Sequence, residues 1–135
     1  MNAYSFEPLT QYIPQLEDGT PFAAVVRDEP ENGVVTLPVI EYTDLAKRIV
    51  RAFYSITDNN PDYSMNALLS VYENSAFAET PLTKVDVSEL DIKSVLALFA
   101  AVMHNERWDS GTLYSFYSSG KLLECLKRLF DANGV

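Results

Sequence analysis

The sequence predicts an α+β fold: one mostly helical domain of about five or six helices with a small β-hairpin near the N-terminus. Three observations predict it. Apolar residues recur every three or four positions through most of the chain, which is the period of amphipathic helices. Two short runs rich in branched apolar residues, 22–26 and 34–42, are typical of strands. The 135 residues, 47% of them hydrophobic, are enough for one core, so we expect a single globular domain over residues 1–135.

The N-terminal segment should form a short, broken helix. Apolar residues recur at helical spacing from Phe6 to Leu16, which favours a helix. Pro14 lacks the N–H group that a helix interior needs, so the helix should be interrupted there. We expect it to end before Asp18.

The two strand-like runs should pair as a hairpin. Turn-forming residues at 28–33 lie between them and end in Asn-Gly, a pair that tolerates positive φ. Pro38 cannot donate a ladder hydrogen bond, so the second strand is interrupted there or lies at an edge. Because an isolated hairpin is only marginally stable in water, this one must lie against helices.

Two helices should follow the hairpin. Thr43 is a suitable N-cap for the first, which carries an apolar stripe and should end at the polar residues 58–61. The second should run from about residue 64 to residue 73. Pro81 indicates that residues 74–86 form a loop.

Three more helices complete the predicted fold. Ser88 and Asp91 resemble a capping box at the start of a helix that is apolar nearly all round, so this helix should be the central one. It should end near Arg107, and Asp109 or Ser110 can cap the short helix that follows. The apolar residues of the final helix are Leu122, Cys125, Leu126, Leu129 and Phe130.

Charge and composition exclude several functions. The formal net charge is −9, whereas binding to a nucleic-acid backbone or to anionic lipid needs clustered Lys and Arg. The single cysteine, Cys125, rules out an internal disulfide. No signal-peptide pattern occurs, and the longest apolar-rich stretch, 95–103, is far shorter than the roughly 20 residues of a membrane span. We therefore expect a cytoplasmic protein that binds neither nucleic acid nor membrane.

The residues with the most chemical potential gather at one helix-to-helix junction, between positions 104 and 111. This junction contains the only histidine and the only tryptophan of the chain. Together with one tyrosine of the next helix, the candidate site residues are His104, Glu106, Arg107, Trp108, Asp109, Gly111 and Tyr114.

The junction has a functional and a structural interpretation. In the first, Glu106 and Asp109 are three residues apart and face one groove, where they serve in acid–base catalysis or ligand binding. In the second, Asp109 caps a helix and Arg107 satisfies a carbonyl or carboxylate group. Trp108 then plugs the junction, and Gly111 lets two backbone segments approach. The structural interpretation accounts for these residues without a ligand.

Other chemistries lack their characteristic residues. Nucleophilic catalysis would need Cys125 or a serine beside His104, but Cys125 falls on an apolar helix face and no Gly-x-Ser-x-Gly motif occurs. One histidine and one cysteine are too few for a zinc site, and no calcium loop, phosphate-binding loop or dinucleotide-binding fingerprint is present. We therefore expect no metal and no cofactor.

Three aromatic residues, Tyr114, Phe116 and Tyr117, follow the junction within one short helix. Three aromatic side chains in four positions cannot all face one core, so at least one should be exposed or lie in a groove. Such a ring suggests a contact surface. The alternative is a tyrosine whose ring is packed while its hydroxyl stays in water.

Two patterns in the chain are shared with one protein family. They are Glu106-Arg107-Trp108-x-x-Gly111, followed by a helix, Gly120 and the leucines at 122, 126 and 129, and the segment Pro38-x-x-x-Tyr42 before a helix. This combination resembles a bacterial family of unknown function over residues 34–58 and 88–130. The resemblance implies an origin in bacteria or their phages and plasmids, with no assigned activity. Trp108 stands where phenylalanine is more usual, and His104 where a more basic residue is usual.

The absence of a catalytic constellation, the many aromatic residues and the acidic charge together favour a non-enzymatic domain that binds another protein or itself. Two alternatives remain open. One is a small enzyme or small-molecule binder with a groove around Glu106, Arg107 and Asp109. The other is an acidic inhibitor or DNA mimic, which needs carboxylates spaced along one face like phosphates.

Overall fold

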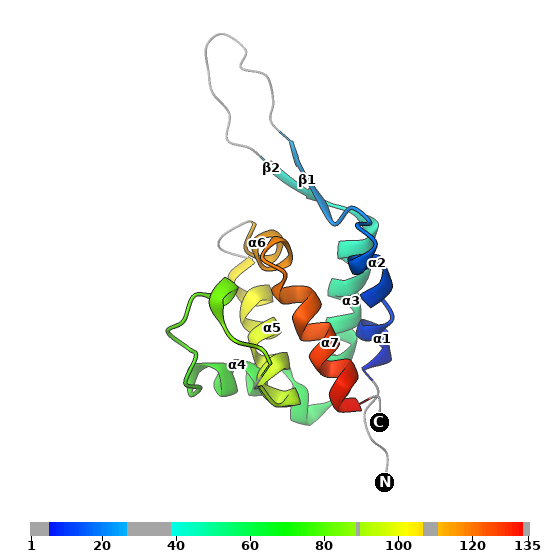
Figure 1. Ribbon diagram of the computed structural model, residues 1–135. Helices are drawn as coiled ribbons and strands as arrows, with labels where there is room; N and C mark the ends of the chain where they lie inside the picture. The colour runs from blue at the N-terminus through cyan, green and yellow to red at the C-terminus, as the bar shows by residue number, and fades with distance from the viewer. Residues whose placement is uncertain (1–5, 27–38, 89, 107–110, 134–135) are drawn as a thin grey trace.

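The computed structural model describes residues 6–26, 39–88, 90–106 and 111–133. These residues form seven α-helices, two short 3₁₀ turns and one two-stranded sheet, so the predicted α+β class is confirmed (Figure 1). The elements are α1 (Glu7–Thr10), α2 (Ile13–Glu17), β1 (Ala23–Val26), β2 (Val39–Tyr42), α3 (Asp44–Asn59), η1 (Pro61–Tyr63), α4 (Met65–Glu73), η2 (Leu82–Lys84), α5 (Ile92–Glu106), α6 (Thr112–Ser118) and α7 (Lys121–Asn133).

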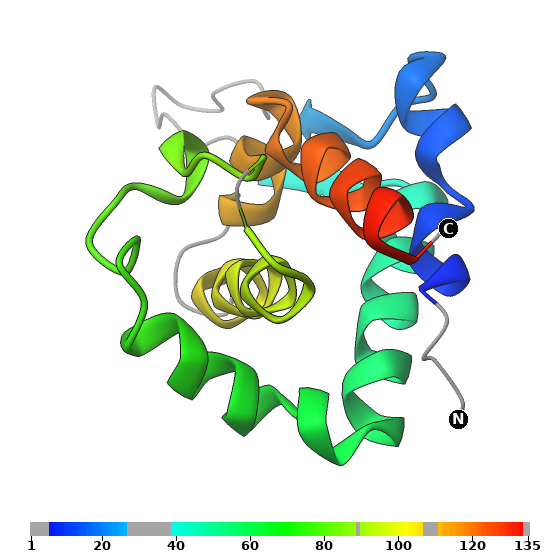
Figure 2. The same cartoon turned by 60° about the horizontal axis from the view of Figure 1, so that its bottom comes forward.

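Helix α5 is the centre of the helical body, as its uniformly apolar sequence predicts. Figure 2 looks roughly along this helix, in yellow-green, and shows α3, α4 and α7 arranged around it. Every residue from Val95 to Met103 is buried. Phe53 of α3 stacks on Phe99 of α5 with ring centroids 4.5 Å apart. A helix enclosed on all sides needs apolar residues on all sides, so its sequence determines its place.

The N-terminal helix is broken as predicted. Helix α1 ends at Thr10, and α2 begins at Ile13 with Pro14 in its first turn. A proline is tolerated there because the N–H groups of a first turn have no partner within the helix. Helix α2 ends at Glu17, before Asp18.

The strands β1 and β2 pair antiparallel, with Ala23 opposite Tyr42 and Val26 opposite Val39. The predicted turn at 28–33 and Pro38 lie outside the described residues. The hairpin projects from one end of the helical body, and its base packs on α6 (Figure 1). There the ring of Phe22 stacks on Tyr117 with centroids 4.3 Å apart. This contact confirms that the hairpin lies against a helix.

Two caps refine the predicted helix starts. Ser64 accepts a hydrogen bond from the Ala67 N–H and caps α4, which begins at Met65, close to the predicted start at about residue 64. Thr43 occupies the N-cap position of α3, but its hydroxyl donates to the carbonyls of Pro21 and Phe22 instead of accepting from the helix. The reason is that β1 begins beside it, so Thr43 ties α3 to the hairpin.

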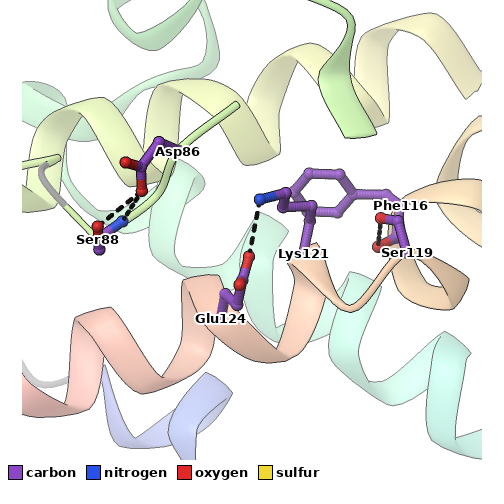
Figure 3. A network of polar contacts seen from close by, with 6 residues as sticks. All are labelled: Asp86, Ser88, Phe116, Ser119, Lys121 and Glu124. Carbon is purple, nitrogen blue, oxygen red and sulfur yellow. Dashed lines mark hydrogen bonds and ion pairs between the residues drawn. The ribbon is translucent and has the colours of Figure 1, made fainter. Parts of the chain in front are cut away.

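The predicted capping box at 88–91 is wrong. Asp91 itself caps α5, because its carboxylate accepts a hydrogen bond from the Ser94 N–H at 2.8 Å. The Ser88 side chain instead turns back to Asp86, to which its hydroxyl donates at 2.7 Å (Figure 3). An aspartate three residues before a free N–H is the better cap, since its charge also suits the positive end of the helix.

Helix α7 closes the fold. Leu122, Cys125, Leu126 and Leu129 are buried as predicted, but Phe130 is 55% exposed. Because Leu129 faces the core, the next residue is rotated by about 100° around the helix, and this rotation carries Phe130 out to solvent. At the start of α7, Lys121 forms an ion pair with Glu124 at 3.1 Å (Figure 3).

Candidate functional site

The carboxylate of Glu106 caps helix α6 from the end of α5. It accepts hydrogen bonds from the backbone N–H of Leu113 at 2.8 Å and of Gly111 at 3.1 Å. The first N–H groups of a helix have no partner within the helix, and their partial positive charge favours an anion. The N-cap position itself is Gly111, which has no side chain to supply. The Glu106 carboxylate is therefore a cap of α6. The caps that the sequence predicts for this helix, Asp109 or Ser110, lie outside the described part of the chain.

Tyr42, the last residue of β2, completes this arrangement. Its hydroxyl donates to the Glu106 carboxylate at 3.0 Å and accepts from the Tyr114 N–H at 3.2 Å. Burial, followed by the hydrogen bond to Glu106, raises the pKa of Tyr42 above its ordinary value. The phenol consequently stays neutral and keeps the proton that it donates. We call Tyr42, Glu106 and the first turn of α6 the Tyr42–Glu106 clasp.

Gly111 is required by two features of the clasp. Its φ is +103°, in the left-handed region that other residues rarely adopt. A Cβ atom at this position would also lie 2.8 Å from the Cδ1 atom of Ile40 in β2. The prediction was that Gly111 lets two backbone segments approach, whereas the group that lies close to it is the Ile40 side chain of the hairpin.

Of the other predicted site residues, His104 takes no part in the clasp, and Tyr114 contributes its backbone N–H to it. His104 lies in the last turn of α5 and is exposed. The side chain of Tyr114 is half-buried, with its ring edge-on to Tyr117 at 6.5 Å. The structure does not describe Arg107, Trp108 or Asp109.

The aromatic residues of α6 do not include a fully exposed ring. Phe116 is buried, and Tyr114 and Tyr117 are half-buried. Of the two interpretations left open, a contact surface or a tyrosine with a packed ring, half-buried Tyr117 agrees with the second, because its ring stacks on Phe22. Phe22, at the base of the hairpin, thus covers apolar surface that α6 would otherwise expose to solvent.

An open cleft lies beside the clasp. Its volume is about 810 Å³, and β2, α3, the last turns of α5 and the first turn of α6 form its walls. Its lining residues fall into three groups. Ala46, Met103 and Leu113 are buried at its floor; Tyr42, Val50, Tyr54 and Glu106 are half-buried on its walls; Glu41, Lys47 and Arg51 are exposed at its rim.

The rim charges of the cleft contrast with the charge of the whole protein. The chain carries a net charge of −9, yet α3 has Lys47, Arg48 and Arg51 and no acidic residue between positions 45 and 57. Lys47 and Arg51 line the cleft, whereas Arg48 does not. Neither of the two rim cations forms an ion pair with a described residue.

The sequence raised a groove around Glu106 only as an alternative, and it did not indicate the role of Tyr42 or the part of α3 in the cleft. The signal for Tyr42 was the Pro38-x-x-x-Tyr42 segment, which shares its family resemblance with Glu106 and Gly111. For the cleft, the signal was a local reversal of charge at Lys47 and Arg51 within one helix of an acidic chain.

The reactive side chains of Glu106 and Cys125 are hydrogen-bonded or buried. Glu106 is already hydrogen-bonded to three groups of the clasp, which limits it as a general base. Cys125 is fully buried, and burial raises the pKa of its thiol, so the reactive thiolate is disfavoured. No group of three or more His, Cys, Asp or Glu residues within the described ranges is placed to hold a metal ion. None of the described helices has the length and apolar character needed to cross a membrane.

Fold and site together define a small helical domain with a projecting hairpin and an apolar cleft beside a hydrogen-bonded clasp. The chain belongs to the family of unknown function DUF6508, whose model matches residues 1–133. No match was found among curated proteins or among solved structures. The prediction of an uncharacterised family is therefore confirmed at that level.

Proposed function

We propose that this protein is a non-enzymatic interaction domain that binds a segment of a partner protein in the cleft between β2, α3 and the α5–α6 junction. The observation that supports this proposal most is that the polar groups beside the cleft are already hydrogen-bonded within the protein. The Glu106 carboxylate and the Tyr42 hydroxyl are hydrogen-bonded to each other and to α6. What faces the ligand is consequently an apolar surface with charges at its rim, the usual composition of a protein-binding site.

The dimensions of the cleft agree with a peptide ligand. Its lining on α3 runs from Ala46 to Tyr54, which is about 12 Å along the helix axis. That length accommodates two turns of a partner helix or about four residues of an extended strand. Half-buried Val50 and Tyr54 lie on this wall and offer an anchor of the kind that dominates protein interfaces.

The test compares cleft and control variants as baits for a partner. Val50→Gln places a polar amide on the cleft wall, and Val71→Gln makes the same change at a half-buried valine of α4 that does not line the cleft. Both baits and the unchanged protein are crosslinked to partners in lysate, and the crosslinked sites are mapped by mass spectrometry. We expect a partner that crosslinks around the cleft and is lost only with Val50→Gln. A partner that is retained by Val50→Gln, or that crosslinks elsewhere, refutes the proposal.

A small-molecule binder is the second candidate. The volume of about 810 Å³ falls in the range of pockets that hold small ligands. Glu106 lines the wall of this cleft, as a groove at the junction requires. A thermal-shift screen with small amphipathic carboxylates, repeated on Val50→Gln, distinguishes this candidate, because only a true cleft ligand stabilises the unchanged protein alone.

Three finer proposals accompany the interaction role. The family resemblance favours an origin in bacteria, their phages or plasmids. A cytoplasmic location agrees with a single cysteine, Cys125, that is buried and reduced. An acidic DNA mimic is disfavoured at α3, because Lys47, Arg48 and Arg51 interrupt any row of carboxylates on that helix.

A further inference from the structure

We propose that the cleft recognises an acidic, apolar peptide segment, with two carboxylates of the partner paired to Lys47 and Arg51. This inference rests on the proposed interaction role and deepens it by specifying the chemistry of the partner. Three features support it: the order of side chains across α3, the rim cations without ion pairs, and the spacing of these cations.

The flank of α3 that faces the cleft changes steadily from apolar to charged. Successive residues of a helix are rotated by about 100°, so the lining residues follow one another around the helix in the order Ala46, Val50, Tyr54, Lys47, Arg51. Ala46 is buried, Val50 and Tyr54 are half-buried, and the two cations are exposed. A ligand that fills the cleft must therefore be apolar on its inner side and meet Lys47 and Arg51 on the α3 side of the rim, where Glu41 of β2 is the other exposed charge.

The two rim cations are available to a partner. Neither Lys47 nor Arg51 forms an ion pair with a described residue, whereas Lys121 and Lys127 are paired with Glu124 and Glu17. In a chain of net charge −9, cations left unpaired beside an apolar cleft are suited to carboxylates that arrive with the ligand.

The acidic charge of the rest of the protein does not prevent this recognition. At physiological ionic strength the Debye length is about 8 Å, so distant carboxylates are largely screened. Ion pairs formed in contact at Lys47 and Arg51 are screened less, particularly where the apolar part of the ligand excludes water. Of the carboxylates that line the cleft itself, Glu106 is hydrogen-bonded within the clasp and Glu41 lies on β2, so Lys47 and Arg51 are the charges that a ligand meets on the α3 side of the rim.

The spacing of the cations sets the spacing of the partner carboxylates. Lys47 and Arg51 are four residues apart on one helix face, with Cβ atoms about 6 Å from each other. Carboxylates match this separation at positions i and i+4 of a helix or i and i+2 of a strand. Either spacing, combined with neighbouring apolar residues, is the signature that we expect in the ligand.

The experiment uses a displayed library of random 12-residue peptides, selected against three forms of the full chain. The first is the unchanged protein, and the second is the cleft variant Lys47→Glu/Arg51→Glu. The third is the control Arg48→Glu/Lys84→Glu, which makes the same change in net charge at two exposed cations that do not line the cleft. Circular dichroism melting verifies that all three forms fold.

The expected result is one peptide class shared by the unchanged protein and the control. These peptides carry an Asp or Glu pair at the stated spacing beside apolar residues. Fluorescence polarisation should show that they bind Lys47→Glu/Arg51→Glu at least about tenfold more weakly, because attraction becomes repulsion at two positions. Selection on that variant should instead enrich peptides with Lys or Arg.

Other outcomes overturn specific statements. Peptides that need Val50 but bind equally well after the Lys47 and Arg51 reversals refute the acidic partner and leave the interaction role standing. Failure to select any peptide that depends on the cleft refutes both. A dimer in light scattering that Lys47→Glu/Arg51→Glu abolishes identifies a second copy of this chain as the occupant and overturns the choice of a separate partner.

Discussion

Removing the Glu106 carboxylate should destabilise the protein by about 3 kcal/mol, because one side chain supplies both the cap of α6 and the partner of Tyr42. The loss of a helix cap costs about 1–2 kcal/mol, since the N–H groups of Gly111 and Leu113 lose their acceptor. The hydrogen bond from Tyr42 to a charged acceptor contributes about 1.5 kcal/mol more. Glu106→Ala is therefore expected to lower the free energy of unfolding by the sum of these two terms.

A double-mutant cycle with Tyr42→Phe isolates the contact across the clasp. Tyr42→Phe alone removes the donor to Glu106, worth about 1.5 kcal/mol, and the acceptor of the Tyr114 N–H, worth about 1 kcal/mol, so it should cost about 2.5 kcal/mol. Because the Tyr42–Glu106 hydrogen bond is lost only once in the double variant, its cost should be about 1.5 kcal/mol smaller than the sum of the two single costs.

Urea denaturation followed by circular dichroism measures these free energies. Glu41→Ala is the control, because Glu41 is exposed next to Tyr42, and its loss should change stability by less than about 0.5 kcal/mol. If Glu106→Ala costs no more than Glu41→Ala, the carboxylate does not cap α6. A coupling of zero between Tyr42→Phe and Glu106→Ala refutes the clasp.

Three further predictions follow from the same structure. Gly111→Ala should cost about 2 kcal/mol and Gly120→Ala about 1 kcal/mol in urea denaturation, because both have positive φ but only Gly111 would meet a neighbouring atom. Equal costs would contradict the close approach at Gly111. Cys125 should react with a thiol reagent only as fast as the protein unfolds, since its side chain is buried and its pKa raised, and rapid labelling of the folded chain would contradict this. Asp91→Ala should cost about 1 kcal/mol at neutral pH, as the loss of an N-cap does. The backbone N–H of Ser94 lowers the Asp91 pKa, so this contribution is present above the usual value of 3.8 and disappears as the pH falls through the lowered pKa. Melting curves between pH 2 and pH 7 should therefore converge for the two proteins at low pH.

The elements that could be predicted from the sequence depend on local properties. The apolar period of α3, the uniform apolarity of α5 and the prolines of the broken N-terminal helix each act through neighbouring residues, so they could be recognised along the chain. The glycine at position 111 was singled out from the sequence, but as a place where two backbone segments meet, whereas the close neighbour is the Ile40 side chain.

The wrong predictions concern helix caps whose side chains have more than one possible hydrogen-bond partner. Thr43 has the residue type of an N-cap, but the carbonyls of Pro21 and Phe22 compete for its hydroxyl. Ser88 has the spacing of a capping box, but Asp86 binds it and Asp91 caps α5. Which of several suitable partners a short polar side chain takes depends on positions that the neighbouring sequence does not specify.

By itself, the sequence determined that this protein is a mostly helical domain with one hairpin, because helix and strand periods are written into adjacent residues. Only the tertiary structure decided what the candidate residues do. It brought Tyr42 to Glu106 across 64 positions of the chain, and it turned a candidate acid–base group into the cap of a helix. It also placed Lys47 and Arg51 at the rim of an apolar cleft. The physical reason is that hydrogen bonds and clefts depend on distances in space, and these distances arise only when the hairpin packs against the helical body.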